Sequence, residues 1–410
     1  MFSQLTPLRR ELSRALPERP FTVRFWDGSE VPSTEGGGPT FILRSPRALA
    51  HLLRRPGELG LGRAYISGAL DVPIDELDAA VALVVDWEPP PVSPRAAARL
   101  ALAAVRACGL VLPPPVPSIE LRQRGALHSL LRDRSAVRHH YDAGNEFFAL
   151  FLDPSMTYSC AIFSRGAKTL EEAQEAKLEM VCRKLVLEPG ERLLDVGCGW
   201  GSFAIHAASR HGVNVLGITL SERQAELARE RVREAGLEDR VEIRVADYRE
   251  LRDPPFDAIA SIGMVEHVGA THLGGYAKSL AAALRPGGRL LNHGIAQVRY
   301  DPEDPFDDAG PISQRYVFPD GDVSPLSYVQ RALEHAGFVT EHVEGFGGDY
   351  VETLTHWIER FDARYDEAVA IAGSERARVW RVYLRAGRMG FATGSESLYQ
   401  VLCRKPVPQS

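Results

Sequence analysis

From about residue 135 onward, short apolar runs alternate with amphipathic stretches along the chain. Short runs rich in Val, Ile and Leu are typical of buried strands, whereas apolar residues spaced three or four apart are typical of helices. Strands are predicted over 192–196, 214–218, 241–245, 256–262 and 289–293, and helices over 202–210, 222–235 and 276–284. This alternation predicts an α/β fold with a doubly wound, Rossmann-like parallel sheet.

The first 88 residues follow a different pattern, in which strand-like and helix-like segments are mixed. Residues 21–26 alternate apolar and polar positions like a strand and continue into Asp27-Gly28, a favourable hairpin turn. A second strand is predicted over 40–44, and helices are predicted over 46–53 and 75–85.

Two Pro-Pro-Pro runs follow, on either side of an Ala- and Arg-rich helix predicted over 95–112. Proline-rich flanks are stiff and extended, as between domains. The helix is apolar apart from its arginines, so it either lies on a membrane surface or packs between domains. We therefore predict an α+β domain over 1–88, a linker with a helix over 89–134, and the α/β domain over 135–410.

Of the 410 residues, 45% are hydrophobic and 25% are charged, as in a globular protein. Residues 1–140 carry 18 Arg against 14 Asp and Glu, although the whole chain has a net charge of −6. This basic part either faces an anionic membrane surface or is an ordinary solvated face, and we expect no nucleic-acid partner. Because no signal peptide or long apolar run is visible, we expect a cytoplasmic protein that meets lipid at the membrane surface.

The spacing of cysteine and histidine predicts no metal. The five cysteines are scattered without paired ligand spacing, which favours reduced thiols. His139 and His140 are adjacent, but no third ligand is suitably spaced.

A glycine turn joins the first predicted strand of the α/β part to its helix, with the order Asp195, Gly197, Gly199. Glycines allow a ligand close to the backbone, and the helix that follows favours a carboxylate at its N-terminus. A dinucleotide fingerprint would place a third glycine where this chain has Ser202. Together with the later Pro-Gly-Gly, the turn favours S-adenosylmethionine over NAD.

The ends of the next two strands carry the other candidate cofactor contacts. The second strand ends without the usual carboxylate for a ribose diol, and Thr219 and Gln224 are the nearest polar groups. After the third strand, Asp247 is placed to accept from an adenine amino group and Tyr248 to cover the ring. Their alternatives are a helix N-cap and an aromatic residue at the edge of the core.

Six ordered motifs resemble the cyclopropane-fatty-acyl-phospholipid synthases and the related mycolic acid cyclopropane synthases. They are His140-Tyr-Asp-x-x-Asn145, Tyr158-Ser-Cys160-Ala, Leu194-Asp-Val-Gly-Cys-Gly-Trp-Gly201, Gly217-Ile-Thr-Leu-Ser-x-x-Gln224, Ser261-Ile-Gly-Met-x-Glu-His-Val268 and Gly348-Asp-Tyr350. The resemblance implies a class I S-adenosylmethionine-dependent methyltransferase fold with a smaller, lipid-engaging N-terminal α+β domain. It also adds four cofactor contacts: Tyr158, Ser159, Trp200 and Gly201.

Enzymes of this family methylate the cis double bond of an acyl chain. The resulting carbocation requires a water-free pocket with negative or π-electron density nearby, and a base must then remove a proton. The family uses a bound bicarbonate as this base. The resemblance places five residues around it: Cys160, Glu266, His293, Ile295 and Tyr350.

Distinct roles are expected for these five residues. Glu266 anchors the site by hydrogen bonding, and His293 and Tyr350 orient the anion. Cys160 and Ile295 contribute backbone groups as much as side chains. The alternatives are a buried small residue for Cys160 and core packing for Tyr350, which is expected in a loop after two glycines.

One departure from the family leaves the product open. Where the family has Leu-His-Thr-Ile-Gly, this chain has Asn-His293-Gly294-Ile295-Ala. Gly294 could reshape the cation pocket, so either a cyclopropane or a 10-methylene chain is expected, the latter with a possible partner reductase. The expected partners are a phospholipid membrane surface and a second copy in a homodimer. A small soluble acceptor and a non-enzymatic lipid-binding protein are the alternatives.

Overall fold

The computed structural model describes residues 5–109, 114–122, 125–141, 143–298 and 310–408. The chain forms two compact units. Unit 1 contains residues 1–120, 310–316 and 373–386, and unit 2 contains residues 121–309, 317–372 and 387–410. Asp142, which belongs to the first motif, and residues 110–112 of the predicted linker helix lie outside the described residues.

Unit 1 is an α+β unit with a small four-stranded sheet of order β2-β1-β3-β4. The predicted hairpin is confirmed, because β1 and β2 pair in antiparallel fashion around Asp27-Gly28. Its elements are α1 (Thr6–Ala15), β1 (Thr22–Arg24), β2 (Glu30–Val31), β3 (Thr40–Leu43), α2 (Pro46–Arg54), α3 (Glu58–Ile66), β4 (Leu70–Asp71), η1 (Ile74–Glu76), α4 (Leu77–Asp86), α5 (Pro94–Cys108), α12 (Gly310–Tyr316) and the first part of α16 (Ser374–Ala392).

Helix α5 belongs to unit 1, whereas the sequence placed it in a linker. Ala103, Ala104 and Ala107 are buried in the core of the unit, and α5 packs against α1 and α2. Leu102 and Val105 are 49% and 52% exposed on its other face. The predicted boundary at residue 88 therefore differs from the structure, because proline runs do not show which core the helix between them joins.

A buried ion pair joins the separate segments of unit 1. Arg63 on α3 donates to both carboxylate oxygens of Glu120 at 2.7 and 2.6 Å, and the side chain of Glu120 is 0% exposed. Tyr316 on α12 donates to the same carboxylate at 2.6 Å. On α16, Arg378 donates to the carbonyl oxygens of Tyr65 and Leu70.

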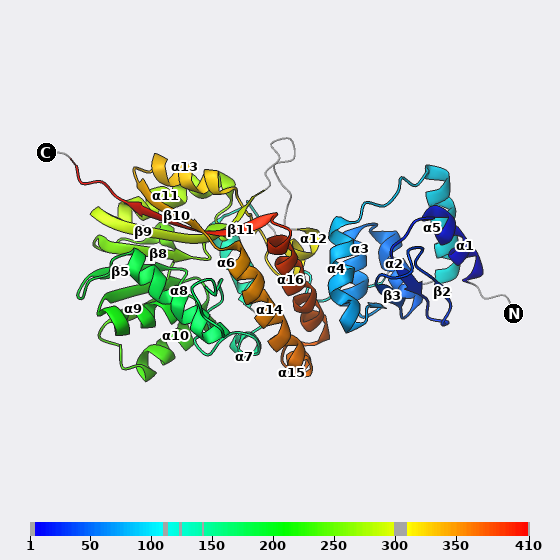
Figure 1. Cartoon of the computed structure of the whole chain (residues 1–410), viewed down its shortest axis with the longest axis horizontal. Helices are drawn as coiled ribbons and strands as arrows, with labels where there is room; N and C mark the ends of the chain where they lie inside the picture. Colours follow the sequence, from blue (N-terminus) through cyan, green and yellow to red (C-terminus); the bar gives the residue numbers. More distant parts are fainter. Residues whose placement is uncertain (1–4, 110–113, 123–124, 142, 299–309, 409–410) are drawn as a thin grey trace. The chain divides into compact units, whose positions relative to one another are not determined.

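Unit 2 is built on a seven-stranded sheet (Figure 1). Its elements are α6 (Leu130–Tyr141), α7 (Asn145–Phe148), α8 (Leu170–Lys184), β5 (Arg192–Val196), α9 (Ser202–His211), β6 (Asn214–Thr219), α10 (Glu222–Glu234), β7 (Val241–Val245), η2 (Tyr248–Glu250), β8 (Phe256–Ile262), η3 (Val265–His267), η4 (Ala270–His272), α11 (Leu273–Ala283), β9 (Leu284–Gln297), α13 (Leu326–His335), β10 (Val339–Gly345), α14 (Gly347–Ala363), α15 (Tyr365–Ala372), the end of α16 and β11 (Glu396–Arg404).

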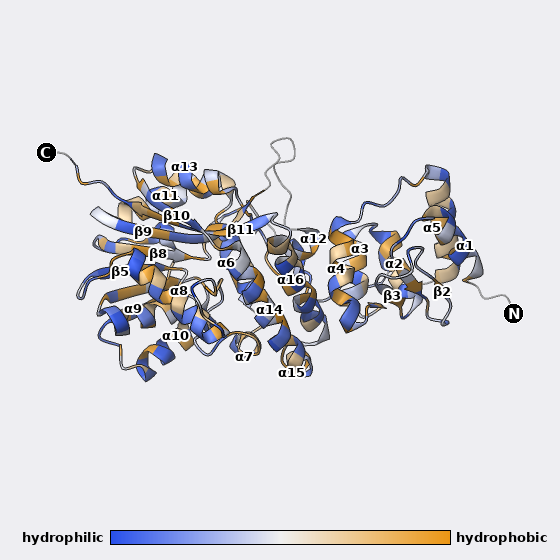
Figure 2. Ribbon diagram, in the orientation of Figure 1, coloured by the Kyte–Doolittle hydropathy of each residue, from blue (hydrophilic) through white to orange (hydrophobic). Residues whose placement is uncertain are grey.

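The sheet has the order β10-β11-β9-β8-β5-β6-β7, with β11 antiparallel to both of its neighbours and the other pairs parallel. Helices α8, α9 and α10 bury their apolar residues on one face, and α11 and α13 bury theirs on the other. These helices carry both hydrophilic and hydrophobic residues (Figure 2). The predicted doubly wound α/β sheet is confirmed, although β10 and β11 were not predicted. None of the described helices has the length and hydropathy of a membrane span.

We expect Arg63→Met to lower the free energy of unfolding by about 2 kcal/mol or more, because it removes both hydrogen bonds of Arg63 to the buried Glu120 carboxylate and leaves Arg315, 3.4 Å away, as its cation. Urea denaturation followed by circular dichroism measures this change. Arg55→Met is the matched control, because Arg55 is exposed and its loss should cost less than about 0.5 kcal/mol. Equal losses for the two variants would contradict the structural role of the buried pair.

Candidate active site

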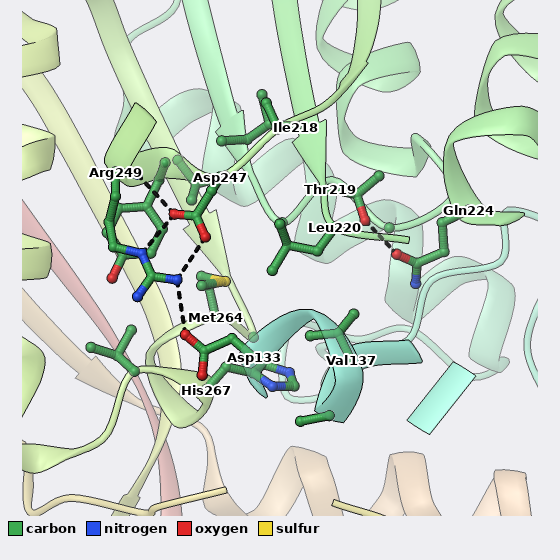
Figure 3. Close-up of a pocket in the computed structure, with 18 of the residues that line it drawn as sticks. Asp133, Val137, Ile218, Thr219, Leu220, Gln224, Asp247, Arg249, Met264 and His267 are labelled. Atoms are coloured by element: carbon green, nitrogen blue, oxygen red, sulfur yellow. Dashed lines mark hydrogen bonds and ion pairs between the residues drawn. The ribbon is translucent and has the colours of Figure 1, made fainter. Parts of the chain in front are cut away.

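A pocket opens at the carboxyl ends of β5, β6 and β8, where the winding of the sheet changes direction. It holds about 890 Å³ of empty space, including open solvent at its mouth. Strand ends, helix α6 and the turns after β7 and β8 form its walls (Figure 3). Six predicted cofactor contacts line it: Gly197, Gly199, Thr219, Gln224, Asp247 and Tyr248.

The glycine turn after β5 forms the floor of this pocket. Gly197, Gly199 and Gly201 have φ values of +79°, +53° and +81°, a region that strongly favours glycine. The backbone N–H groups of Gly197 and Cys198 donate to the carbonyl oxygen of Ile218 at 3.0 and 2.9 Å. Gly201 then begins α9 as its N-cap, so the free N–H groups of the helix follow directly after the turn.

Asp195 and Lys177 are two buried ionisable side chains that influence each other's pKa near the turn. Asp195 is 1% exposed, and its Oδ2 has no hydrogen-bond partner among the described residues. Burial raises the pKa of Asp195 to about 7, and the nearby Lys177 opposes this rise. Lys177 is 1% exposed and donates to Ser159 Oγ at 2.7 Å, and burial lowers its pKa to about 8. The sequence analysis did not single out Lys177, because it lies within an amphipathic helix.

Thr219, at the end of β6, and Gln224, in the first turn of α10, contact each other, and their predicted role as the polar groups nearest to a ribose stays a prediction. The hydroxyl of Thr219 donates to Gln224 Oε1 at 2.7 Å (Figure 3). The Gln224 amide also faces the hydroxyl of Tyr141 from α6. Both side chains are buried, so their polar atoms are fixed toward the pocket.

Asp247 lines the pocket, but its carboxylate is engaged by Arg249. Asp247 Oδ1 accepts from Arg249 Nε at 2.8 Å and Oδ2 accepts from Arg249 Nη2 at 2.7 Å (Figure 3). Asp247 also caps η2 by accepting from the Arg249 backbone N–H, which is the alternative role that the sequence left open. Arg249 donates further to Asp133 at 2.8 Å. Tyr248 packs edge-on against Tyr276 and still lines the pocket.

The remaining five predicted cofactor residues do not line the pocket. They are Tyr158, Ser159, Asp195, Trp200 and Gly201. Trp200 is buried, and its Nε1 donates to Asn145 Oδ1 at 2.8 Å. Tyr158 stacks on Trp357 with ring centroids 5.2 Å apart. The side chains of Tyr158 and Trp200 therefore pack within the protein next to the glycine turn and do not face the pocket.

Sequence reasoning missed pocket residues from α6 and from the turn after β8. Asp133, Val137 and Tyr141 enter the pocket from α6. This helix crosses residue 134, which the sequence analysis took as a domain boundary. Met264 and His267 also line the pocket, and their signal was their place in the Ser261–Val268 motif.

Glu266 lies in η3 beside the pocket residue His267 and is 5% exposed. Its Oε1 accepts from the backbone N–H of Ile295 at 2.7 Å, whereas Oε2 has no partner among the described residues. Burial raises the pKa of Glu266 to about 7. Ile295 thus contributes a backbone group, as expected, but this group holds Glu266.

His293 is fully buried on β9, opposite the last residue of β8, and burial lowers its pKa well below the ordinary value. Lys184 Nζ donates to Gln400 Oε1 at 2.7 Å, which turns Gln400 Nε2 toward His293 Nδ1 at 3.2 Å. Because Gln400 Nε2 is a donor, Nδ1 accepts and the proton of the neutral imidazole lies on Nε2. That Nε2–H has no partner among the described residues, so it is available to an anion.

Cys160 and Tyr350 join this region through the backbone of the sheet edge. Cys160 Sγ lies 3.9 Å from the carbonyl oxygen of Phe346, which also accepts from the backbone N–H of Tyr350 at 3.2 Å. Phe346 donates its own N–H to Leu398, and Leu398 pairs with Ile295 across the β9–β11 ladder. The five predicted catalytic residues are therefore linked within one continuous region of unit 2.

The expected loop around Tyr350 is wrong, because Tyr350 lies in the first turn of α14. Asp349 favours a helix start there, and its carboxylate accepts from the backbone N–H groups of Phe163 and Ser164 at 2.6 and 2.7 Å. The ring of Tyr350 packs 4.5 Å from that of Phe391, so the core-packing alternative also applies. Cys160 is fully buried, and burial raises its thiol pKa well above the ordinary value.

The fold and the pocket define a class I S-adenosylmethionine-dependent methyltransferase. The family model described as mycolic acid cyclopropane synthetase matches residues 128–401. The chain belongs to this family.

Relatives of known name agree with this assignment. A probable fatty acid methyltransferase of Mycobacterium tuberculosis is 39% identical over 97% of this chain and 94% of its own. The cyclopropane-fatty-acyl-phospholipid synthase of Escherichia coli K12 is 41% identical over 66% of this chain and 68% of its own. The crystal structure of mycolic acid cyclopropane synthase CmaA1 with SAH and CTAB has a TM-score of 0.62 and 32% identity, covering 66% of this chain and 98% of that one.

We expect Glu266→Gln to stabilise the protein more at alkaline than at acidic pH. Between its ordinary pKa of 4.5 and the folded value of about 7, the unfolded chain has lost the Glu266 proton and the folded chain keeps it. The free energy of unfolding of the wild type therefore falls as pH rises through this window, and the Gln variant escapes this loss. Denaturant titrations at about pH 5.5 and about pH 8 should show the variant gaining about 2 kcal/mol on the wild type.

Glu226→Gln is the control for this titration, because Glu226 is exposed on α10. Its stability difference from the wild type should be the same at both pH values. A Glu266→Gln difference that is equally independent of pH would show that Glu266 titrates normally.

Proposed function

We propose that this enzyme methylates the cis double bond of unsaturated acyl chains in membrane phospholipids and uses bound bicarbonate as the base. The observation that carries the proposal is the buried pair Glu266 and His293, each with one polar atom that has no partner among the described residues. Such atoms are costly in a dry interior unless a ligand satisfies them. Their position beside the cofactor pocket suits a reaction that begins with methyl transfer.

S-adenosylmethionine, when bound, supplies an electrophilic methyl group. The residues of the chain must then hold the acyl double bond near it and exclude water, since water would capture a carbocation. Aromatic residues from several elements, including Tyr141, Phe148, Tyr158, Trp200 and Trp357, contact one another behind the glycine turn. They keep this side of the site apolar, and their faces offer π-electron density.

The residues also fit a bound bicarbonate, which would supply the base that removes the final proton. His293 would donate its Nε2–H to the anion, because Nδ1 already accepts from Gln400. Glu266 would face it with Oε2. Two negative groups side by side disfavour joint ionisation, and the raised pKa of Glu266 allows it to keep a proton and donate it.

The choice of a fatty acyl chain as substrate is supported by the extent of the likeness to known relatives. The fatty acid methyltransferase of Mycobacterium tuberculosis matches across both units of this chain. Cyclopropane mycolic acid synthase 2 of Mycobacterium bovis matches only 61% of this chain, although that match covers 87% of its own length. The extra N-terminal unit suits peripheral binding to a membrane surface.

Gly294 bears on the product, which is either the cyclopropane or the 10-methylene chain, with a slight preference for the latter. A Cβ at Gly294 would lie 2.3 Å from Val265 Cγ1 and 3.6 Å from Glu266 Oε1. Val265 therefore fills the space that a side chain at this position would take, directly beside the anchor of the base. A methylene product would require a separate reductase to saturate it. The homodimer stays a prediction.

The decisive experiment incubates the full-length protein and S-adenosylmethionine with vesicles of anionic phospholipid that carry oleoyl chains. Mass spectrometry should show acyl chains heavier by one CH₂, and proton NMR should distinguish a ring from an exocyclic methylene. Glu266→Gln should lose at least about 100-fold in turnover while its affinity for S-adenosylmethionine stays close to the wild-type value. Vesicles with saturated chains are the substrate control.

A wild-type enzyme that neither co-sediments with these vesicles nor alters their lipids would overturn the proposal and favour a small soluble acceptor. Full activity of Glu266→Gln would overturn the catalytic assignment alone.

Gln400 gives a separate test of the anion site. In Gln400→Glu, the carboxylate would accept a hydrogen bond from His293 Nδ1–H, so the unprotonated Nε2, an acceptor, would face the anion. We expect Gln400→Glu and Gln400→Leu to lower turnover to the same extent, without weakening S-adenosylmethionine binding. Nitrogen-15 NMR of labelled histidine reports the tautomer directly, and an Nδ1-protonated His293 in the wild type would contradict the assignment.

A further inference from the structure

Three metal-ligating side chains converge between α8 and α9. Cys182 comes from α8, and His206 and His211 come from α9. One ligand atom from each lies within 4.8 Å of the other two. No other cluster of three or more possible metal ligands is found among the described residues. The proposed methyltransferase chemistry does not use this cluster.

A carboxylate, Glu179, contacts two of these three side chains. Its Oε2 lies 3.3 Å from His206 Nε2 and 3.0 Å from His211 Nε2, so both imidazoles point at one oxygen atom. Its other oxygen, Oε1, accepts from Arg183 Nε at 2.6 Å. Glu179 precedes Cys182 by three residues on α8, which places the two side chains on the same face of the helix.

We propose that Cys182, His206 and His211, with Glu179 as fourth ligand, bind one divalent transition-metal ion, with Zn²⁺ as the best match. A thiolate, two imidazoles and a carboxylate are ligands that zinc accepts, and four protein ligands are typical of its structural sites. Tetrahedral ligands at zinc distances lie about 3.3–3.8 Å apart. The thiol and imidazole atoms, now within 4.8 Å of one another, would move closer together on binding, and the carboxylate of Glu179 would turn toward the thiol of Cys182.

Because this cluster lies at the far end of α9 from the cofactor pocket, we expect the ion to have a structural role. Gly201 begins α9 at the cofactor pocket, and His211 ends it, about 15 Å away for a helix of this length. The ion would hold α8 to α9, whose apolar residues already share one core. An ion can enter from solvent, because the side chains of His206, His211 and Glu179 are 11%, 19% and 30% exposed.

Binding would release a proton from the buried thiol of Cys182, since the thiolate is the form that ligates. The inference departs from the expectation of no metal. The sequence could not show the site, because Cys182 and His206 lie on successive helices on either side of β5 and only packing brings them together.

Cobalt(II) is the probe of choice, because thiolate ligation gives it a charge-transfer band and tetrahedral geometry gives it intense visible bands. The full-length protein, freed of metal with a chelator, should bind one cobalt per chain with both signals, and zinc should displace the cobalt. Cys182→Ser should lose the charge-transfer band. Cys403→Ser is the matched control, because Cys403 is also fully buried in unit 2 but lies on β11.

His211→Gln changes a more exposed ligand, so it tests the site even if Cys182→Ser fails to fold. We expect it to bind cobalt at least about tenfold more weakly. Zinc should raise the melting temperature of the wild type and of Cys403→Ser, but not that of His211→Gln. Absence of stoichiometric binding, or equal binding by His211→Gln, would overturn the proposal. Methyl transfer should not depend on zinc, so this result is independent of the proposed function.

Discussion

Ionisable groups held away from water are the constraint on which the rest of this site depends. Asp195, Lys177, Glu266 and His293 are all buried around the carboxyl edge of one sheet. An interior of this kind tolerates such groups only when other dipoles or charges satisfy them, and three of the four keep an unsatisfied atom among the described residues. Under the proposed function, bound ligands would complete these interactions, so the same residues would carry both a stability cost and a binding role.

Helix α9 connects two sites that differ in chemistry. At the carboxyl ends of β5, β6 and β8, glycine turns and polar side chains form an open pocket. At the other end of α9, a thiol and two imidazoles gather between two helices that otherwise pack through alanine and other apolar side chains. Because α9 begins at one site and ends at the other, an ion bound at the proposed metal site would lie well away from the transferred methyl group.

Periodicity was sufficient to predict the central strands, because each is short, apolar and bounded by turns. It did not predict β10 and β11, whose exposed or mixed positions lack that contrast. The resemblance to family motifs found Glu266, which follows the end of β8, and His293, which lies within β9. Gln400 and Lys184 were missed because their role depends on pairing between β9 and β11, which joins residues far apart in the sequence. Arg249 was missed for a similar reason, because it acts by donating hydrogen bonds to both Asp133 and Asp247, which are far apart in the sequence.

Unit 1 is discontinuous in the sequence, and this affects how the protein is made. Its core contains the first 120 residues, but α12 and the first part of α16 also belong to it. A ribosome therefore completes most of unit 2 before it releases the last piece of the smaller unit. Since domains tend to fold as their residues emerge, the early segment must wait with Glu120 and the carbonyl oxygens of Tyr65 and Leu70 lacking their later partners. Vectorial synthesis thus delays the completion of unit 1 until residue 386 has been made, when unit 2 lacks only the end of α16, β11 and the residues after it.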